Sequence, residues 1–309
     1  FKIGDSNIYA FDVVILIFAL FGVLYFLLVK KSLVISRSHF YFLFFCLVAV
    51  VSLVFSFFKY IPNEILSGSM YLVRFLGYLT SGIVVYNMRK NNLISAKEMF
   101  NSIISSGVLL SIVGIIQLIL LPDFEVLDPG LGWDPHKNRL ASSFFDPNFV
   151  GSYLSICLVL LFDKWYSVKK FSIFDFLSFG LILVSVFLTF SRSAWAMLAV
   201  IIFIFGWFKS KTLLYVSLLV VFCAYFAVPR VQTRISGATD PADSARFRFA
   251  SWSKAWEVSK ENLLIGAGFN NFKAAQKDLG LLTPEQELSH SASGSDSSLL
   301  LVLATTGIA

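Results

Sequence analysis

The sequence predicts an all-α integral membrane protein, a multi-pass helix bundle that carries a large, partly helical extracytoplasmic loop. The first observation is the composition, with 57% hydrophobic and only 14% charged residues, whereas soluble domains carry about 25% charged residues. The second is a series of long apolar runs, which give a mean hydropathy of +0.77. The third is one long polar stretch, residues 230–297, set between two apolar segments.

Eight apolar runs approach or reach the roughly 17–25 residues that cross a bilayer as a helix. They are Ile8–Val29, Phe40–Ile61, Ser69–Met88, Phe100–Leu121, Asn148–Phe162, Ile173–Phe190, Ala194–Phe208 and Leu213–Val228. We therefore predict a transmembrane bundle of about eight helices in residues 1–229. A ninth run begins at Ser298, so residues 298–309 are expected to start a further transmembrane helix, and both ends of the sequence are expected to be trimmed.

The short links between these runs differ in charge. Lys and Arg gather after the first, third, fifth and seventh runs, and the other links are poorer in them. Basic links stay in the cytoplasm, so the link Pro122–Pro147, the turn Ser191–Ser193 and the loop of residues 230–297 are predicted to face outside. This pattern explains the net charge of +6. The expected partner is thus the lipid bilayer and not a nucleic acid.

The loop of residues 230–297 has a predicted structure of its own. Pro241-Ala-Asp-Ser244 is typical of a helix start. Phe249, Trp252 and Trp256 then recur at three and four residues, as one face of a helix does. A Trp-rich face suits the membrane interface. Gly266-Ala-Gly268 predicts the turn that ends this part of the loop.

A reaction at the outer face needs a substrate that is already activated, because no ATP is available there. A glycan on a polyprenyl diphosphate is such a substrate: an acceptor hydroxyl attacks the anomeric carbon and the diphosphate leaves. Arg suits the leaving diphosphate because its planar fork binds phosphate oxygens in pairs and stays charged. The candidate diphosphate-binding residues are Arg74, Arg139, Arg192, Arg246 and Arg248.

For two of these arginines, Arg139 and Arg74, the position at a helix offers a structural explanation as an alternative to diphosphate binding. Arg139 precedes Asp146-Pro-Asn148, a predicted helix start that would fix its position, and the alternative is a side chain that reaches the headgroups. Arg74 lies within an apolar run, where a charge is costly and is usually functional or paired. It too can reach outward to the headgroups, so the sequence leaves both explanations open.

The remaining arginines lie in a turn or in the loop. Arg192 follows Ser191 in a tight turn, where headgroup contact is the alternative. Arg246 and Arg248 are two residues apart, so on a helix they point to different faces and only one is expected to meet a substrate. For Arg230 and Arg234, which follow a helix end, headgroup contacts are favoured.

The attacking hydroxyl gains from a base, and His has a suitable pKa. His290 is the preferred base and His136 is its rival. Asp296 is a further candidate, either as the base or to orient His290, and its alternative role is the N-cap of the last helix. No acidic pair and no Cys/His cluster stands at metal-ligand spacing, so neither a metal nor another cofactor is expected. The three cysteines lie in apolar runs and are expected to be buried without disulfides: Cys46, Cys157 and Cys223.

Several segments together resemble the O-antigen ligases and related polysaccharide polymerases. Residues 139–153, RLASSFFDPNFVGSY, are similar to the segment that enters a helix in that family. Residues 188–195, LTFSRSAW, are similar to its turn between two helices. IGAG at residues 265–268 and LLLVLATTGI at residues 299–308, after Arg248 and Trp252, match its closing pattern. The resemblance covers about Arg139 to Ile308.

This resemblance implies a GT-C-like enzyme that transfers a glycan from undecaprenyl diphosphate, without a metal, at the outer face of the bacterial plasma (inner) membrane. The partners would be a polyprenyl-diphosphate-linked glycan donor and a glycan, lipid-core or protein acceptor. It implies Arg139 and one of Arg246 or Arg248 for the diphosphate, and His290 for the acceptor hydroxyl. Many members place His and Asn before the last helix, whereas Asp296 and Ser297 stand here, which keeps Asp296 open as the base.

Other functions stay open at this point. Ligase and polymerase differ only in the acceptor, and the sequence does not separate them. A transporter or flippase for lipid-linked glycans would also use a membrane charge such as Arg74. Transporters often show internal repeats and helices broken by Pro or Gly, and neither a repeat nor a Pro deep in an apolar run is present, so the transferase is preferred. A third class, a membrane scaffold, predicts that changes at the outer Arg and His residues are silent.

Overall fold

The protein is almost wholly helical, as predicted. The computed structural model describes residues 2–3, 6–7, 9–127, 136–168, 171–236, 244–288 and 290–308. Within these ranges the only strands are β1 (Lys2–Ile3) and β2 (Ser6–Asn7), which form a short antiparallel pair. A chain in a bilayer must satisfy its backbone hydrogen bonds internally, and a helix does so within one segment.

Every predicted apolar run forms a helix. The first eight runs give α1 (Ala10–Leu24, continued by the π-helical η1, Tyr25–Val29), α2 (Arg37–Ser56), α3 (Pro62–Lys90), α4 (Ala96–Leu120), α5 (Pro147–Val168), α6 (Ile173–Leu188), α7 (Arg192–Phe208) and α8 (Lys211–Ala227). The ninth gives α13 (Ser298–Thr306). The polar loop contains α9 (Pro229–Ser236), α10 (Ser244–Glu261), α11 (Phe272–Asp278), α12 (Pro284–Leu288) and the 3-10 turn η5 (His290–Ser293). The prediction of a partly helical loop is therefore confirmed.

Five helices in the described ranges are long and apolar enough to cross a bilayer. They are Ala10–Val29, Arg37–Ser56, Pro62–Lys90, Ala96–Leu120 and Pro147–Ser167. α8 and α9, bent by 100° at their junction, give a sixth candidate if they count as one span. α6 and α7 are apolar but have only 16 and 17 residues. The multi-pass membrane fold is thus confirmed, while the number of about eight spans and the division into residues 1–229, 230–297 and 298–309 stay predictions.

Serine side chains set the start of many helices. The side chain of an N-cap Ser accepts a backbone N–H of the first turn, which otherwise has no partner. Ser95 and Ser172 do this within capping boxes that are completed by Glu98 and Asp175. The same cap is present at Ser36, Ser191, Ser210 and Ser297. The serines of the short polar links therefore mark where these six helices begin.

The outer surfaces of the spanning helices are apolar. On α2, Phe40, Phe42 and Phe55 are 62%, 54% and 53% exposed, which suits contact with lipid and not with water. All three cysteines are free thiols, and two of them, Cys46 and Cys157, are buried as predicted. Cys223 is exposed, so the prediction of burial is wrong there, because only part of the α8 surface packs against α7.

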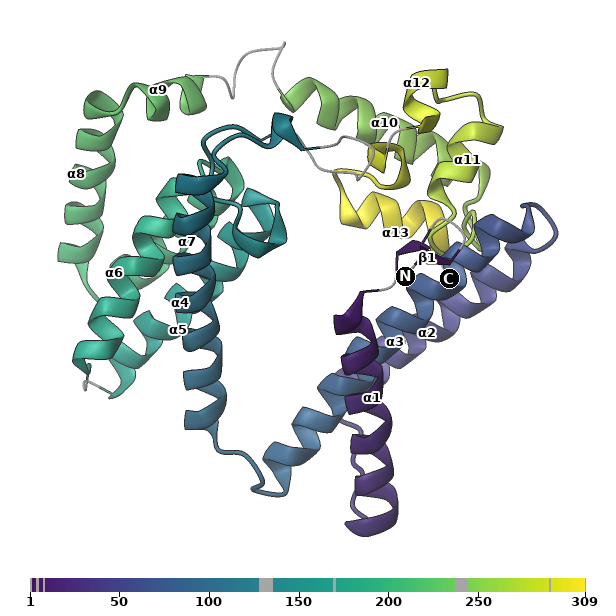
Figure 1. The fold of residues 1–309 in the computed structure, drawn as a ribbon, viewed down its shortest axis with the longest axis horizontal. Coiled ribbons are helices and arrows are strands. Elements are labelled where there is room, and N and C mark those ends of the chain that lie inside the picture. Colours follow the sequence, from purple (N-terminus) through teal and green to yellow (C-terminus); the bar gives the residue numbers. More distant parts are fainter. Residues whose placement is uncertain are drawn as a thin grey trace. The chain divides into compact units, whose positions relative to one another are not determined.

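The chain divides into two compact units. The first comprises Phe1–Ile94 and Ser244–Ala309. In this unit α1 and α2 pack on α3, and α13 packs on both α10 and α2 (Figure 1). The core joins Leu53 of α2 and Leu72 of α3 to Ala255, Phe272 and Ala304 of the C-terminal helices. The C-terminal part of the loop is therefore a folded body and not a loose connection.

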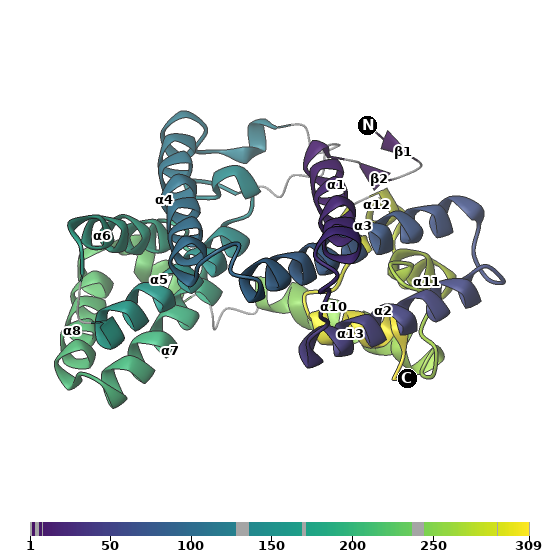
Figure 2. The ribbon, with the colours of Figure 1, turned by 90° about the horizontal axis from the view of Figure 1, so that it is seen from below.

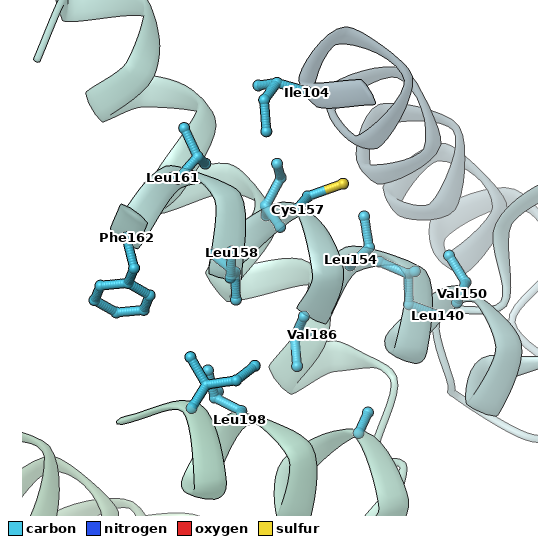
Figure 3. Packing of buried hydrophobic residues seen from close by; sticks show 13 residues of the cluster. Ile104, Leu140, Val150, Leu154, Cys157, Leu158, Leu161, Phe162, Val186 and Leu198 are labelled. Carbon is cyan, nitrogen blue, oxygen red and sulfur yellow. The ribbon is translucent and has the colours of Figure 1, made fainter. Parts of the chain in front are cut away.

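The second unit comprises Ser95–Asp243. α5 is its central helix: it packs on α4, α6 and α7, and α8 packs on α7 (Figure 2). Figure 3 shows Leu154 and Leu158 of α5 in the same buried cluster as Val186 of α6 and Leu198 of α7. Leu140, which belongs to the link before α5, lies in this cluster with 0% exposure. This core positions the link that carries Arg139.

Candidate functional site

The segment around Arg139 is held to α4 by one side chain. The amide oxygen of Gln117 accepts the backbone N–H groups of Ala141 and Ser142, at 2.9 and 3.2 Å. Its amide nitrogen donates to the carbonyl of Leu121 at 2.8 Å. Ser142 has a φ of +52°, a conformation that costs free energy and persists where the surroundings hold it. Gln117 therefore fixes the backbone directly after Arg139.

Asp146 fixes the other end of this segment. Its carboxylate oxygen accepts the N–H groups of Asn148 and Phe149, at 2.6 and 3.2 Å. These N–H groups belong to the first turn of α5, where a carboxylate also interacts favourably with the helix dipole. The predicted helix start at residues 146–148 is thus confirmed.

The turn before α7 is joined to the Arg139 segment by side-chain hydrogen bonds. The Nε of Arg139 donates to the carbonyl of Thr189 at 2.9 Å. The hydroxyl of Ser191 donates to the side-chain carbonyl of Asn148 at 2.7 Å. The segments of residues 139–153 and 188–195, which are far apart in the sequence, therefore form one structural element.

Four arginines gather around this element. Arg139 is half-buried, and burial is the largest effect that lowers its pKa. The charges of Arg234, Arg230 and Arg192 lower it further, and Asp146 offsets part of this, so the pKa falls to about 10. Arg139 still carries its charge at neutral pH. Four guanidinium groups thus share a region with one carboxylate, an arrangement that favours a bound anion.

Arg230 reaches this cluster from α9. Its Nη2 donates to the carbonyl of Lys137 at 2.6 Å, and its guanidinium lies 4.1 Å from the ring centroid of Phe190. Burial, followed by the charge of Arg234, lowers the pKa of Arg230. The sequence favoured headgroup contacts for Arg230 and Arg234, and the structure places the charges of both beside Arg139.

An apolar cavity of about 570 Å³ has two of these arginines, Arg192 and Arg234, in its wall. The rest of the wall comes from α5 to α9 and is almost wholly apolar, with Phe187, Trp195 and Val231 among its residues. Ligand pockets commonly have volumes of roughly 300–1,000 Å³. The cavity therefore suits an apolar chain whose charged end meets the arginines.

Arg74 belongs to the other compact unit, where it pairs with Asp12. Its Nη2 lies 2.8 Å from the Oδ2 of Asp12, and its guanidinium lies 5.0 Å from the ring centroid of Tyr71 and 5.7 Å from that of Tyr9. A charge within a spanning helix usually has such a partner. The pair with Asp12 accounts for a charge at this position, and the role of Arg74 in binding a diphosphate stays a prediction.

The glycine turn of the loop packs on the end of α13. The backbone N–H groups of Ala267 and Gly268 donate to the carbonyls of Ala304 and Thr305, at 2.9 and 3.0 Å. Gly266 has a φ of +77°, and a Cβ there would collide with the carbonyl carbon of Thr305. Only glycine fits this approach. The predicted turn is thus confirmed, and the two segments of the closing pattern are in direct contact.

The predicted residues of the polar loop lie on α10 and before α13. Arg248 is exposed on α10. The side chains of Arg246 and His290 lie outside the described part of the structure, and their backbones belong to α10 and η5. Pro241–Asp243, the first part of the predicted helix start, also lie outside the described residues, and α10 begins at Ser244.

Asp296 does not cap the last helix. The N-cap of α13 is Ser297, whose hydroxyl accepts the N–H of Leu300 at 3.3 Å, so the N-cap explanation of Asp296 is wrong. The backbone N–H of Asp296 donates to the Ser251 hydroxyl of α10 at 3.0 Å, and the residue is exposed. α10 therefore holds this position in place, and the role of Asp296 as a base stays a prediction.

His136, the rival base, lies at the arginine cluster. Its Nδ1 is 3.4 Å from the Nη1 of Arg139. Of the residues predicted from the sequence, the second unit thus brings together Arg139, Arg192 and His136. No three His, Cys, Asp or Glu side chains in the described ranges are grouped so that they could hold a metal ion, and the metal-free site stays a prediction.

Sequence reasoning missed Gln117, Arg230 and Arg234 as parts of the site. Gln117 gave a signal, because it is a polar residue inside the apolar run that became α4. Arg230 and Arg234 gave another, because a spacing of four residues places both on one face of a short helix. Their proximity to Arg139 had no local signal, since it depends on how the chain returns from α8.

The family model described as O-antigen ligase matches residues 177–309. This range contains the turn of residues 188–195, the arginines of α9 and the contact between the glycine turn and α13, and it begins after Arg139. No curated protein matches the chain. No solved structure matches it either. The part of this chain from residue 177 to residue 309 is thus similar to the O-antigen ligase family.

Proposed function

We propose that this protein transfers a glycan from a polyprenyl diphosphate, undecaprenyl diphosphate in bacteria, to an acceptor hydroxyl at the outer face of the plasma membrane. The family match supports a function of the ligase or polymerase type in general. One observation carries the choice of donor: three arginines gather around Arg139, and two of them, Arg192 and Arg234, line an apolar cavity. A polyprenyl diphosphate joins an anionic group, which the arginines would bind, to an apolar chain, which the cavity would hold.

The arginine cluster would hold the diphosphate. In the empty protein, burial and like charges lower the pKa of Arg139, so the charged cluster is unfavourable by itself. A diphosphate would offset this repulsion, and the planar forks of Arg donate to its oxygens in pairs. The first isoprene units of the carrier would enter the cavity between α6 and α9. The same contacts would stabilise the leaving group as its negative charge grows.

The transfer itself forms one bond and breaks one. The acceptor oxygen attacks the anomeric carbon, and the bond from this carbon to the diphosphate oxygen breaks with its electron pair on the diphosphate. The acceptor proton passes to a base, for which we propose His290 or Asp296 of the loop. One of Arg246 and Arg248 would assist the donor. The reaction as written needs neither a metal nor a cofactor.

The outer face is proposed from the charges of the links. Lys and Arg are concentrated after the odd-numbered apolar runs, which favours a cytoplasmic location for those links. Arg139, Arg192 and the loop of residues 230–297 then face the extracytoplasmic side. The acceptor there is a hydroxyl of a glycan, a lipid core or a protein.

The test is transfer by the purified protein in nanodiscs, with a polyprenyl diphosphate glycan, a panel of acceptors and EDTA. Arg139→Gln and Arg234→Gln are each expected to lower the rate by about 100-fold, the usual effect of removing one donor to a developing anion. Lys137→Gln is the matched control: Lys137 lies in the same link, its side chain is 62% exposed, and it pairs with Asp123 at 2.9 Å. It is expected to keep full activity.

The outcomes separate the proposals. Product in the presence of EDTA supports a metal-independent transferase, and the acceptor that is used decides between ligase and polymerase. Folded Arg139→Gln and Arg234→Gln variants with full activity would exclude the arginine cluster as the donor site. In vesicles made of the same lipid, movement of the lipid-linked glycan across the bilayer without any product would support the flippase instead.

A further inference from the structure

α10 presents one stripe of residues to the protein. Ala255, Val258 and Ser259 have 0% exposure and recur at three and four residues, so they share one side of the helix. Ser251, four residues before Ala255, lies at the beginning of this side, and its hydroxyl is 3.3 Å from the hydroxyl of Ser295. α10 packs on α13 and α11, so this stripe accounts for the attachment of the helix to its unit.

A second stripe, beside the first, is aromatic and exposed. It consists of Phe249, Trp252 and Trp256, which are 65%, 38% and 49% exposed. We name these three residues the aromatic stripe. The rings of Phe249 and Trp252 are in edge contact, with centroids 5.3 Å apart. Three large exposed aromatic side chains in a row form an apolar patch of the kind that marks a binding surface.

A third stripe is polar. It consists of Ser253, Glu257 and Glu261, which we name the polar stripe and which are spaced by four residues. Ser253 and Glu261 are exposed and Glu257 is half-buried. Lys260, at its edge, pairs with Glu257 at 2.9 Å. A helix with an aromatic side next to a charged side has the character of one that lies in the plane of a membrane surface.

The neighbours of α10 in its own unit support the bilayer as the partner that covers the aromatic stripe. α13, on which α10 packs, exposes Leu299 by 85% and Val302 by 40%. α13 in turn packs on α2, a membrane-spanning candidate. In Figure 1, α10 runs crosswise to α1, which is another spanning candidate of the same unit. A helix crosswise to a spanning helix lies near the membrane plane, where Trp is enriched.

We propose that α10 is an in-plane helix whose aromatic stripe inserts into the headgroup region of the bilayer that α1 to α3 cross. Its polar stripe faces water. This contact would hold the C-terminal body of the first unit, including Asp296, at a constant height above the membrane. The proposal does not depend on the proposed transferase function.

The test measures the depth of single spin labels on α10 in phospholipid nanodiscs. Cys223→Ser removes the exposed thiol, and Cys46 and Cys157 are buried. One cysteine is then placed at each position of the aromatic stripe and, as the matched control, at each position of the polar stripe. Collision rates with oxygen, which concentrates in lipid, are compared with those of a water-soluble nickel chelate. The aromatic positions are expected to lie about 5–10 Å below the headgroup surface, with an oxygen-to-nickel ratio several-fold above that of the polar positions.

Equal ratios at the two stripes would overturn the proposal. Labels at the aromatic stripe that are shielded from both reagents would also overturn it, since a protein surface and not lipid would then cover the stripe. A second measurement avoids the labels: quenching of native Trp fluorescence by doxyl lipids is expected to fall in Trp252→Phe/Trp256→Phe. An unchanged lipid quenching in this folded variant would contradict insertion.

Discussion

Replacement of Arg139 by Gln is expected to abolish the response to diphosphate without weakening the empty protein. The pKa of Arg139 is lowered to about 10. At about 1.4 kcal/mol per pH unit, the charged form of Arg139 in the folded protein therefore costs roughly 3 kcal/mol relative to the unfolded chain. Loss of the charge-assisted hydrogen bond from Arg139 to the carbonyl of Thr189 removes about 1.5–3 kcal/mol of stabilisation. The net change is a gain of about 0–2 kcal/mol.

The pH dependence follows from the direction of the pKa shift. Below about pH 10, Arg139 is protonated in both the folded and the unfolded protein, so its cost is fully present and constant. This cost declines only as the pH rises above about 10, where the folded group loses its proton before the unfolded one. The stability difference between wild type and Arg139→Gln is therefore expected to be constant between about pH 8 and pH 9.

The assay is thermal unfolding of the purified protein in detergent, with and without inorganic pyrophosphate. Wild type is expected to be stabilised by about 2.7 kcal/mol when the pyrophosphate concentration is 100 times its Kd, and Arg139→Gln much less. Lys137→Gln, whose side chain is exposed and paired with Asp123, is expected to respond like wild type. A strong destabilisation of Arg139→Gln without ligand, or a wild-type response to pyrophosphate, would refute the reasoning.

Two further predictions concern the backbone of the two units. Gln117→Leu leaves the buried N–H groups of Ala141 and Ser142 without their acceptor, which costs about 1–3 kcal/mol for each group. The substitution is therefore expected to lower the melting temperature and the transfer rate. Gln117→Glu keeps an acceptor and is expected to recover part of the rate. Unchanged melting and activity in Gln117→Leu would show that this anchor is dispensable. Gly266→Ala places a Cβ against the Thr305 backbone at a positive φ and is expected to cost more than about 1–3 kcal/mol, seen as a loss of folded protein in size-exclusion chromatography; a normal yield and melting temperature would contradict this close approach.

Local sequence patterns predicted the helices of the bundle, but they predicted the ends of the helices less well. Each apolar run became a helix because a chain in lipid has no other partner for its backbone groups. The helix of the polar loop followed from the spacing of Phe249, Trp252 and Trp256. The N-cap of α13 was misassigned to Asp296, because Asp and Ser are both good caps and stand next to each other here. In the structure Ser297 is the N-cap, and the backbone N–H of Asp296 donates to Ser251.

The candidate site was only partly visible before the structure. Arg139 and Arg192 stood out because each is a cation on a link that carries few others. Arg74 stood out for the cost of a charge in a span, and its partner Asp12 lies 62 residues earlier in the chain. The grouping of Arg230 and Arg234 with Arg139 was not foreseen, because it joins segments about 90 residues apart.

The sequence by itself determined the helical membrane fold and the resemblance to the O-antigen ligases, since hydrophobic length and short motifs are local properties of the chain. The tertiary structure decided which charged residues form ion pairs and which lie together in a cluster of like charge. It pairs Arg74 with Asp12, places Arg230 and Arg234 beside Arg139, and seats Gly266 against Thr305. These contacts depend on the packing of whole helices, and electrostatic interactions act through space and not along the sequence.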